Sequence, residues 1–388
     1  MLAEMAEAGA LGEEWRGAFE RTPRSAFVPD AVWAPDDDAP TGYRRITKVD
    51  DPDAWWSLVN ADGVVVTQVD DGHEDGPGIA TSSASMPSLV AGMLRHLDVR
   101  DGHNVLDVGT GTGWTSALLC SLLGDNHVTT VEVDPAIAAE AASKLGAAGF
   151  APKRVIGDGL EGWPDAAPYD RIHSTAAVRQ VPSAWIEQTR PGGIIVTPWG
   201  TPYANAALLR LTVGEPGGPS HGQFVGNVSF LWMRAQRPHA VIEPPGAPDH
   251  RGPSAMDPEL ALEDVNAAFA IGLRVPGIRY EHVWDDTDPS GTYRMRLSDG
   301  AGSWASVRYA AWDAEDAVHQ CGPRRLWDEI ASARRWWLKE GRPGLCRFGV
   351  TIAPDGAQSV WLDDPRNPPP GPGPPPPRSG RPVRRPRP

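Results

Sequence analysis

Short apolar runs alternate with longer amphipathic stretches through the middle of the chain. Runs such as NVLDV (104–108), HVTTVEV (127–133) and GGIIVTP (192–198) have the length and the Val and Ile content of buried strands. Apolar positions recur at helical spacing over 115–124 and 135–145, after the first two of these runs. Strands that alternate with helices build a parallel sheet with helices on both faces. The pattern therefore predicts an α/β fold with a doubly wound sheet.

The regions on either side of this pattern are less regular. Residues 2–20 are amphipathic with a helical period, and this helix should end near Pro23, because the residue before a proline disfavours helical angles. Residues 29–63 are rich in Asp, Pro and Gly, which predicts mostly loop. Two long alternating segments, 205–213 and 224–234, predict antiparallel strands at the edge of the sheet.

Length and composition divide the chain into parts. A chain of 388 residues exceeds the roughly 250 to 300 residues that one core usually holds. The first predicted domain covers 1–236, with an insertion at about 34–78, and a Pro- and Gly-rich linker is expected over 237–258. The smaller α+β domain is expected over 259–364 and a disordered Pro- and Arg-rich tail over 365–388. The elements predicted for the smaller domain are helices at 258–270 and 324–340 and hairpins at 292–309 and 347–362.

Charge and cysteine content exclude several classes of protein. The net charge of −14 argues against a nucleic-acid partner, because binding phosphates requires a basic face. Cys120, Cys321 and Cys346 are widely spaced and odd in number, which indicates neither a disulfide framework nor a metal site. The acidic first residues do not resemble a signal peptide, and no segment has the length and apolar character of a membrane span. We therefore expect a cytoplasmic, monomeric protein that binds no membrane.

The most informative motif is VLDVGTGTGW, at 105–114. A strand ends there and the chain turns through Gly109, Gly111 and Gly113 into a helix, so that backbone amides can approach a ligand closely. Dinucleotide-binding proteins use a related loop, but their glycine spacing differs. Asp107, just before the loop, would repel a pyrophosphate and suits a cationic cofactor that carries an amino group.

Acidic residues at the next two strand ends extend this picture to a nucleoside. Glu132 follows the loop by about 20 residues, where a carboxylate can accept both ribose hydroxyls. Asp158 ends the third strand and can accept the adenine amino group. Each carboxylate taken singly could instead be a strand-end cap, whereas three in register favour a nucleoside. The predicted cofactor-binding residues are Asp107, Gly109, Thr110, Gly111, Gly113, Trp114, Glu132, Val133, Asp158 and Gly159, with Trp114 packing on the cofactor or in the core.

Four motifs in order resemble the protein-L-isoaspartate O-methyltransferase family over roughly residues 14–234. They are RTPRSAFVP (21–29), VLDVGTGTGW, GDGLEGWPDAAPYDRIHSTAA (157–177) and TRPGGIIVTPWG (189–200). The resemblance implies a class I methyltransferase (Rossmann-like) fold, S-adenosylmethionine as cofactor, and methylation of the carboxylate of L-isoaspartyl residues in a peptide or protein. The family's substrate-side motif, of the Thr-Ile-Ser-Gln-Pro type, is resembled by residues 83–87.

Departures from the family pattern suggest a narrower substrate. Ser83 stands where the family has Thr and Met86 where it has Gln, and the chain adds an acidic insertion, a second domain and a tail. Together these features resemble an actinobacterial subgroup that tailors ribosomally made peptides such as lanthipeptides. In that subgroup an ordinary Asp of a cyclised precursor is methylated, and its ester collapses to an aspartimide or rearranges to isoaspartate.

The chemistry implied by this resemblance needs positioning more than proton transfer. A carboxylate with a pKa near 4 is already ionised at neutral pH, so no general base is required. The hydroxyls of Ser83 and Ser85 are the predicted catalytic groups, because they can orient the carboxylate by hydrogen bonds without neutralising it. The alternative is that Ser85 caps the helix predicted from Pro87.

Three functions remain open on the sequence alone. The first is tailoring of a cyclised peptide through its Asp or isoaspartyl carboxylate. The second is general repair of isoaspartyl damage by the same reaction. The third belongs to another class, a non-catalytic peptide-binding protein that retains the fold.

Overall fold

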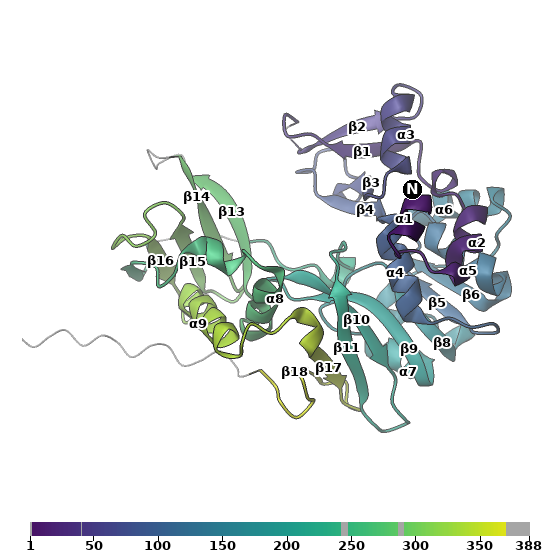
Figure 1. Ribbon diagram of the computed structural model, residues 1–388. Coiled ribbons are helices and arrows are strands. Elements are labelled where there is room, and N and C mark those ends of the chain that lie inside the picture. The colour runs from purple at the N-terminus through teal and green to yellow at the C-terminus, as the bar shows by residue number, and fades with distance from the viewer. Residues whose placement is uncertain (1, 40, 242–246, 286–290, 370–388) are drawn as a thin grey trace, which may run out of the picture. The chain divides into compact units, whose positions relative to one another are not determined.

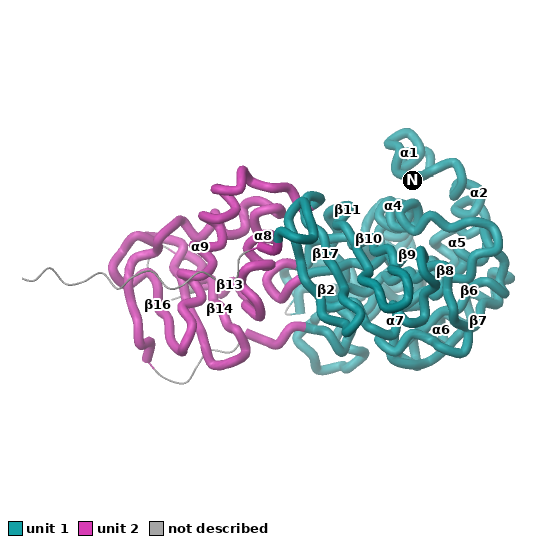
Figure 2. Tube along the Cα trace, turned by 90° about the horizontal axis from the view of Figure 1, so that it is seen from below, with its two compact units in different colours: residues 1–200, 205–237, 346–367 teal, residues 201–204, 238–345, 368–388 magenta. Residues whose placement is uncertain are grey.

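The computed structural model describes residues 2–39, 41–241, 247–285 and 291–369, and divides into two compact units (Figures 1 and 2). Unit 1 comprises Met1–Gly200, Asn205–Arg237 and Cys346–Asn367. Unit 2 comprises Thr201–Ala204, Pro238–Leu345 and Pro368–Pro388. Most of the predicted tail, 370–388, lies outside the described residues.

Unit 1 is built on a nine-stranded sheet with the order β18-β17-β11-β10-β9-β8-β5-β6-β7 (Figure 1). Strands β5 to β9 pair in parallel, and the pairs from β9 to β18 are antiparallel. The chain begins this sheet at β5 in its interior and reverses direction between β5 and β8, which creates a switch point where ligands of such folds bind. The strands are β5 Val105–Val108, β6 Val128–Glu132, β7 Lys153–Ile156, β8 Tyr169–Ser174, β9 Thr189–Gly200, β10 Asn205–Thr212, β11 Ser220–Asn227, β17 Phe348–Ile352 and β18 Gln358–Leu362.

Helices connect the parallel strands as the hydrophobic pattern predicts. Helix α5, Trp114–Leu123, is almost wholly buried, which explains why its sequence is apolar on all sides. Helix α6, Pro135–Ala147, begins at the predicted proline and is capped by Asp134, whose side chain accepts from two first-turn amides. The other helices of unit 1 are α1 Leu2–Glu7, α2 Glu13–Arg21, α3 Pro52–Asn60, α4 Pro87–Leu97 and α7 Ser183–Gln188.

The inserted region is not the loop that its composition predicted. It forms a four-stranded antiparallel sheet with the order β2-β1-β3-β4, in which a small core gathers around Trp55. Its strands are β1 Ala31–Pro35, β2 Tyr43–Thr47, β3 Val65–Val69 and β4 Ala80–Ala84. The prediction failed because the turn residues sit between strands of only five residues, too short for a clear alternation.

A buried arginine fixes this inserted sheet to the rest of unit 1. The Arg24 guanidinium is 3% exposed and donates to the carbonyls of Val59, Ala61, Gly63 and Ala84 at 2.8 to 3.4 Å. Burial lowers its pKa to about 10, which still leaves it charged at neutral pH. Four carbonyl acceptors from two segments, residues 59–63 and the end of β4, thus converge on one side chain, and β4 is held at a defined position.

Unit 2 contains a five-stranded antiparallel sheet with the order β12-β16-β15-β14-β13, and α9 packs against β14, β15 and β16 (Figure 1). The strands are β12 His250–Gly252, β13 Arg279–Asp285, β14 Thr292–Ser298, β15 Trp304–Arg308 and β16 Val318–Cys321, and the helices are α8 Val265–Arg274 and α9 Leu326–Lys339. The predicted α+β character, the hairpin at 292–309 and the helix at 324–340 are therefore present, whereas β13 and β16 were not foreseen.

Several predicted boundaries differ from the structure. The hairpin at 347–362, assigned to the smaller domain of 259–364, instead extends the main sheet, because β17 pairs with β11 through Ser220 to Gln223. The expected linker over 237–258 contributes β12 to unit 2. The N-terminal helix breaks near Gly9, whose backbone is left-handed (φ 69°). The strand expected over 224–234 ends at Asn227.

Candidate functional site

A cavity of about 200 Å³ opens at the carboxyl ends of β5, β6 and β8, at the switch point of the sheet. One water needs only about 10 to 15 Å³, so the space suits a much larger ligand. The lining residues come from the strand ends with the predicted carboxylates, from the predicted serine segment at 81–85, and from residues 231–235, to which no motif pointed. They are Thr81, Ser82, Ser83, Ser85, Val108, Gly109, Gly111, Val131, Glu132, Val133, Ile137, Asp158, Gly159, Thr175, Ala176, Leu231, Trp232, Met233, Arg234 and Ala235.

The glycine turn presents bare backbone to this cavity. Gly109 and Gly111 have φ of 84° and 53°, a left-handed conformation that side chains rarely adopt. A Cβ on Gly111 would have only one backbone oxygen within 4 Å, at 3.9 Å, so it would project into open space beside the turn. Gly113 is needed for packing rather than for ligand access. A Cβ at this position would lie 3.1 Å from Leu145 and would force α5 and α6 apart.

Glu132 ends β6 at the rim of the cavity, and its carboxylate is 7% exposed. One oxygen accepts from the Gly111 amide at 2.9 Å and the other from the Asp134 amide at 3.1 Å. Burial raises the pKa of Glu132, while these backbone donors oppose that rise. A carboxylate has about four acceptor positions, so two remain for hydroxyl donors of a ligand.

Asp158 also lines the cavity, with its side chain exposed. Its carboxylate accepts from the Leu160 amide at 2.9 Å and so caps the short turn after β7. The capping role and the predicted ligand contact thus occur at the same residue. Gly159 is required beside it, because a Cβ there would lie 2.5 Å from Val108.

Four predicted cofactor residues do not reach the cavity. Asp107 is fully buried, and it accepts from Ser116 at 2.6 Å and lies 2.8 Å from Nδ1 of His173. It holds β5, α5 and β8 together rather than facing a ligand. Trp114 packs edge-on against Phe19 in the core. The remaining two are Gly113 and Thr110, whose hydroxyl bonds to that of Thr130 at 2.7 Å.

The opposite wall of the cavity comes from β4 of the inserted sheet. Thr81 and Ser83 share one face of this strand, and Ser85 follows it on the way to α4. Both predicted serines therefore line the cavity. Ser85 does not cap α4, because the N-cap is Met86 and the Ser88 amide donates to Asp62 at 2.9 Å.

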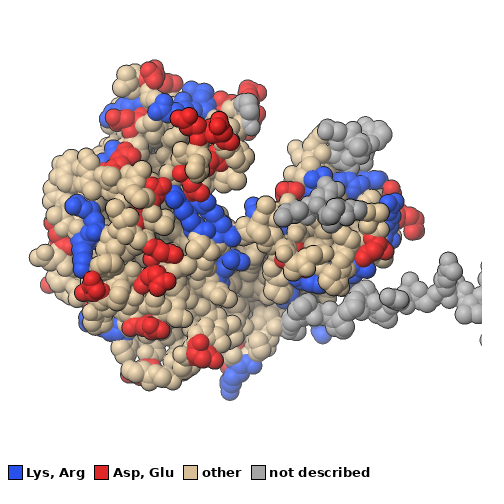
Figure 3. All heavy atoms as spheres, turned by 180° about the vertical axis from the view of Figure 1, so that it is seen from behind, with Lys and Arg blue, Asp and Glu red and all other residues tan. Residues whose placement is uncertain are grey.

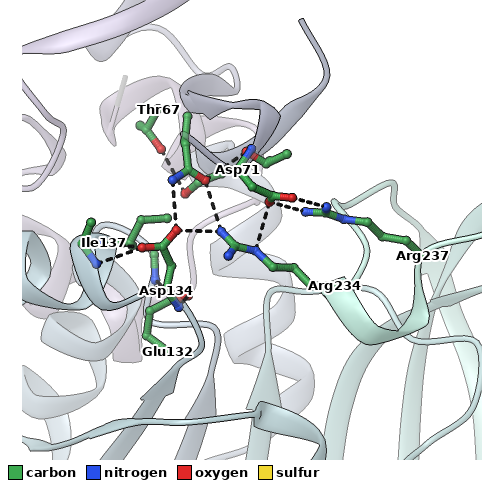
Figure 4. A network of polar contacts seen from close by, with 12 residues as sticks. Thr67, Asp71, Glu132, Asp134, Ile137, Arg234 and Arg237 are labelled. Carbon is green, nitrogen blue, oxygen red and sulfur yellow. Dashed lines mark hydrogen bonds and ion pairs between the residues drawn. The ribbon is translucent and has the colours of Figure 1, made fainter. Parts of the chain in front are cut away.

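The segment of residues 231–235, which follows β11, completes this wall, and its Arg234 joins a polar network (Figure 4). Arg234 donates to Asp134 at 2.8 Å and to Gln68 at 3.3 Å, and its Nε lies 3.1 Å from Asp71. Asp71 in turn accepts two bonds from Arg237, at 2.6 and 2.8 Å. The network connects the inserted sheet, the start of α6 and the segment after β11.

Charge is balanced within this network, since two arginines face two aspartates. Burial opposes ionisation of Asp134, but bonds from Gln68, Arg234 and the α6 amides outweigh it and lower the pKa to about 2. Bonds from Arg237 likewise lower the pKa of Asp71, against the effect of burial. The arginines are therefore occupied in holding the wall, as is the hydroxyl of Thr81, which donates to Gln68 at 2.9 Å. The hydroxyls of Ser83 and Ser85 are the other polar groups of this wall that line the cavity.

The sequence carried little signal for the second wall. Residues 231–234 were assigned to an edge strand, and neither Gln68 nor Asp71 was singled out. Ion pairs between residues about 100 to 166 positions apart leave no local pattern. Within the described residues, no three His, Cys, Asp or Glu side chains form a group able to hold a metal, and no helix is both long and apolar enough to cross a membrane.

Comparisons with known proteins point to one family. Residues 72–217 match the family model "Protein-L-isoaspartate(D-aspartate) O-methyltransferase". A protein-L-isoaspartate O-methyltransferase from Methanocella arvoryzae is 34% identical over 199 residues, which are 51% of this chain and 88% of that protein. One from Ignicoccus hospitalis is 43% identical over 121 residues, 31% of this chain and 57% of that protein. The chain thus spans between about half and nine tenths of these relatives.

A solved structure titled protein-L-isoaspartate O-methyltransferase extends the likeness to both units. It matches 94% of this chain and 98% of its own length, with a TM-score of 0.53 and 18% identity. At this identity the likeness concerns the fold alone. The predicted doubly wound class I methyltransferase fold is confirmed, and an additional unit beyond the main sheet is not peculiar to this chain.

Proposed function

The chain belongs to the protein-L-isoaspartate O-methyltransferase family, and from that premise we propose that it methylates a free carboxylate of a peptide or protein substrate. Members of this family are S-adenosylmethionine-dependent carboxyl methyltransferases, which agrees with the enzyme class and the cofactor predicted from the sequence.

One observation carries the proposal: a single cavity has a backbone-lined wall at the strand ends and a hydroxyl-lined wall on β4. The first wall fits the cofactor, because Gly109 and Gly111 leave room beside their amides and Glu132 keeps free acceptor positions. Asp158 offers a further carboxylate, which can accept a hydrogen bond from the adenine amino group of the cofactor. The second wall suits an anionic substrate group, since hydroxyls donate hydrogen bonds without adding charge.

The residues of this site need only bind and orient. The cofactor, when bound, supplies a methyl group on a positively charged sulfur. A substrate carboxylate is ionised at neutral pH, so no residue has to remove a proton from it. The hydroxyls of Ser83 and Ser85 would hold its oxygens in line for attack, which is the main requirement of a displacement between two bound groups.

For the substrate we propose an L-isoaspartyl residue as the first candidate. Tailoring of one cyclised peptide is the second, and the inserted sheet motivates it, because strands β1 to β3 precede and support the substrate wall on β4. The second unit no longer distinguishes the two, since a structure with the repair enzyme's title has a matching fold over 94% of this chain.

The test combines titration calorimetry with mass spectrometry. S-adenosylmethionine and its product S-adenosylhomocysteine should both bind, and a short peptide with L-isoaspartate should gain one methyl group that is later lost as methanol. The same peptide with ordinary Asp is the matched control and should stay unmodified. Cofactor binding without methylation of either linear peptide, but with methylation of a cyclised Asp peptide, would favour tailoring. Absence of cofactor binding would leave the non-catalytic alternative.

A further inference from the structure

A second cavity, of about 160 Å³, lies in unit 1 and is lined by α7, the start of β11 and the turn that joins β17 to β18. Ser220 and Ile352 both line it, and they pair with each other across β11 and β17. The preceding strand β10 ends beside the first half of β9, where Thr212 pairs with Ile194. The cavity is therefore at the end of the sheet where the parallel strands begin, opposite the cofactor cavity, and the two share no lining residue.

The polar side chains of this second cavity are acidic or uncharged. They are the carboxylates of Glu187 and Asp355 and the hydroxyls of Ser183 and Ser220, and no Lys, Arg or His is among the lining residues. Glu187 forms no hydrogen bond or ion pair with any described residue. Asp355 accepts one bond, from the Ala357 amide at 3.0 Å. We call this site the acidic cavity.

The acidic cavity suits a cation that has several hydrogen-bond donors. Its carboxylate oxygens are acceptors, and Ser220, which is 2% exposed, keeps one lone pair beside the bond that it accepts from Gly214 at 3.1 Å. A guanidinium matches them, because it binds carboxylates through two parallel hydrogen bonds. Ile186 and Ile352 add apolar surface against which the aliphatic part of an arginine can pack. A calcium ion fits less well, since it takes about six to eight oxygen ligands.

Surface charge alone does not single out this site. Figure 3 shows Asp and Glu side chains spread over one face of the larger unit, with Lys and Arg among them. The acidic cavity differs from such scattered groups because its carboxylates stand at a hollow and Glu187 has no basic partner among the described residues.

The C-terminal segment of the chain contains cations that match this cavity. Residues 378–388 include five arginines, and no Asp or Glu follows Asp364. The arginines, which lie outside the described residues, are Arg378, Arg381, Arg384, Arg385 and Arg387. Their charge complements the carboxylates of the cavity. Because they belong to the same chain, their effective concentration at the cavity is high.

The length of chain before the arginines is sufficient to reach the acidic cavity. The segment leaves unit 1 at Asn367, whose side chain donates to the Leu362 carbonyl, at the end of β18, at 3.0 Å. The cavity lies at the other end of β18, beside the turn before Gln358. The five residues of β18 cover about 17 Å, whereas the ten residues 368–377 can span up to about 33 Å. Arg378 is therefore within reach of the cavity.

We propose that the acidic cavity binds an arginine of residues 378–388 of the same chain. Attraction between the guanidinium and the carboxylates of Glu187 and Asp355 would hold the C-terminal segment at the end of the main sheet that is opposite the cofactor cavity. The contact does not depend on the proposed function, because no residue of the cofactor cavity takes part in it. It should weaken as salt rises, since both carboxylates are exposed.

The test compares the full chain with a variant that combines Glu187→Gln and Asp355→Asn. Both replacements remove the negative charge, and the asparagine can still accept from the Ala357 amide. Glu20→Gln combined with Asp53→Asn, at exposed positions of α2 and α3, is the control of equal charge change.

Cleavage by trypsin measures whether the arginines are bound. The cleavable bonds follow Arg378 and Arg384, because the other three arginines precede proline, and intact-mass spectrometry gives the rate. At low salt we expect the cavity variant to be cut about fivefold faster than the unchanged chain, and the control within about twofold of it. Equal rates in all three proteins would overturn the proposal.

A binding assay checks the same contact without proteolysis. The receptor is the full chain with the five arginines of residues 378–388 replaced by glutamine, so that its own segment does not compete, and the probe is a fluorescent peptide of residues 368–388. We expect the probe to bind, and Glu187→Gln in the receptor to weaken binding about threefold. A probe with glutamine in place of arginine should bind at least about fivefold more weakly.

Two outcomes would reject the contact even if the double variant is unstable. An affinity that Glu187→Gln leaves unchanged would mean that the arginines bind elsewhere. Protection from trypsin that rises with protein concentration would assign the bound arginine to a second copy of the chain, and would overturn binding within one chain.

Discussion

The two walls of the cavity are built in different ways. The strand-end wall is largely backbone, made by a glycine turn and by Glu132 at the end of β6. The β4 wall is made of side chains, and it is held in place by ion pairs that join distant segments. The first can bind the same nucleoside with little dependence on other side chains. The second can change its residues, and hence its substrate, without disturbing the first.

The largest effect should come from filling the backbone wall. Gly111→Val places a branched side chain in the open space beside the turn, at a left-handed φ that valine avoids. We expect cofactor affinity to fall by at least about 100-fold, since a clash at the binding surface costs several kcal/mol. Calorimetry with S-adenosylhomocysteine measures it. Gly146→Val, on α6 with nothing within 4 Å of its Cβ, is the control and should bind normally. Unchanged affinity in Gly111→Val would reject the loop as the cofactor site.

A somewhat smaller effect is expected from the acidic residue of the same wall. Glu132→Ala removes the acceptor for ligand hydroxyls, and cofactor affinity should fall about 10- to 30-fold, in the range of charged hydrogen bonds. Because burial raises the pKa of Glu132, its protonated form should appear above the ordinary value of 4.5. Lowering the pH through that range should therefore weaken cofactor binding in the unchanged chain. An affinity independent of pH down to 4.5 would contradict the role.

Substitution of Asp107 is the companion experiment, because the sequence predicted that both acids bind the cofactor. Asp107→Asn leaves a donor in place of one acceptor oxygen next to Ser116 and His173, and an unsatisfied buried donor costs about 1 to 3 kcal/mol. Thermal unfolding should show the loss of stability. The affinity of the folded variant for the cofactor should change less than that of Glu132→Ala.

These two acids show what the sequence could and could not predict. The alternation of strands and helices predicted β5 to β9 and their positions along the chain, because each element has its own hydrophobic period. It could not tell how close to the end of its strand an acidic residue lies. Glu132 is the last residue of β6 and reaches the rim, whereas Asp107 is in register with Thr130, two residues earlier, and is fully buried. Residues two apart on a strand share a face, so depth along the strand separates the two acids.

The β4 wall was predicted only through the family resemblance of its serines. Nothing local indicated that Thr81, Ser83 and Ser85 would face the glycine turn, since that depends on Arg24 fixing the inserted sheet. Likewise, Arg234 reaches the cavity only because β11 ends at Asn227 and the chain turns back. Contacts between segments far apart in sequence determine the orientation of β4 and the position of Arg234, and such contacts cannot be predicted from composition.

Substitutions in the β4 wall should separate substrate positioning from cofactor binding, the two functions of the cavity. In Ser83→Ala combined with Ser85→Ala we expect kcat to fall about tenfold, because two orienting hydrogen bonds are lost, while cofactor affinity is retained. Methylation kinetics and calorimetry on the same protein measure this. Thr112→Ala, in the glycine turn but outside the lining of the main cavity, is a control. Normal turnover in the double variant would assign these serines no part in positioning.

The smallest effect concerns the ion pairs behind that wall. Arg237→Gln removes the bidentate partner of Asp71, a half-exposed pair that contributes no more than about 1 kcal/mol. We expect KM for an isoaspartyl peptide to rise about threefold with cofactor affinity unchanged, because the loosened segment belongs to the β4 wall.

Added salt should raise KM in the unchanged chain by weakening the same pair, and should have less effect in the variant. Arg347→Gln breaks a comparable bidentate pair with Asp363, between the residue before β17 and the residue after β18, and it should leave KM and its salt dependence as they are. If both variants behave alike, the network around Arg234 does not shape the substrate wall, and the contrast between the two walls reduces to the serines of β4.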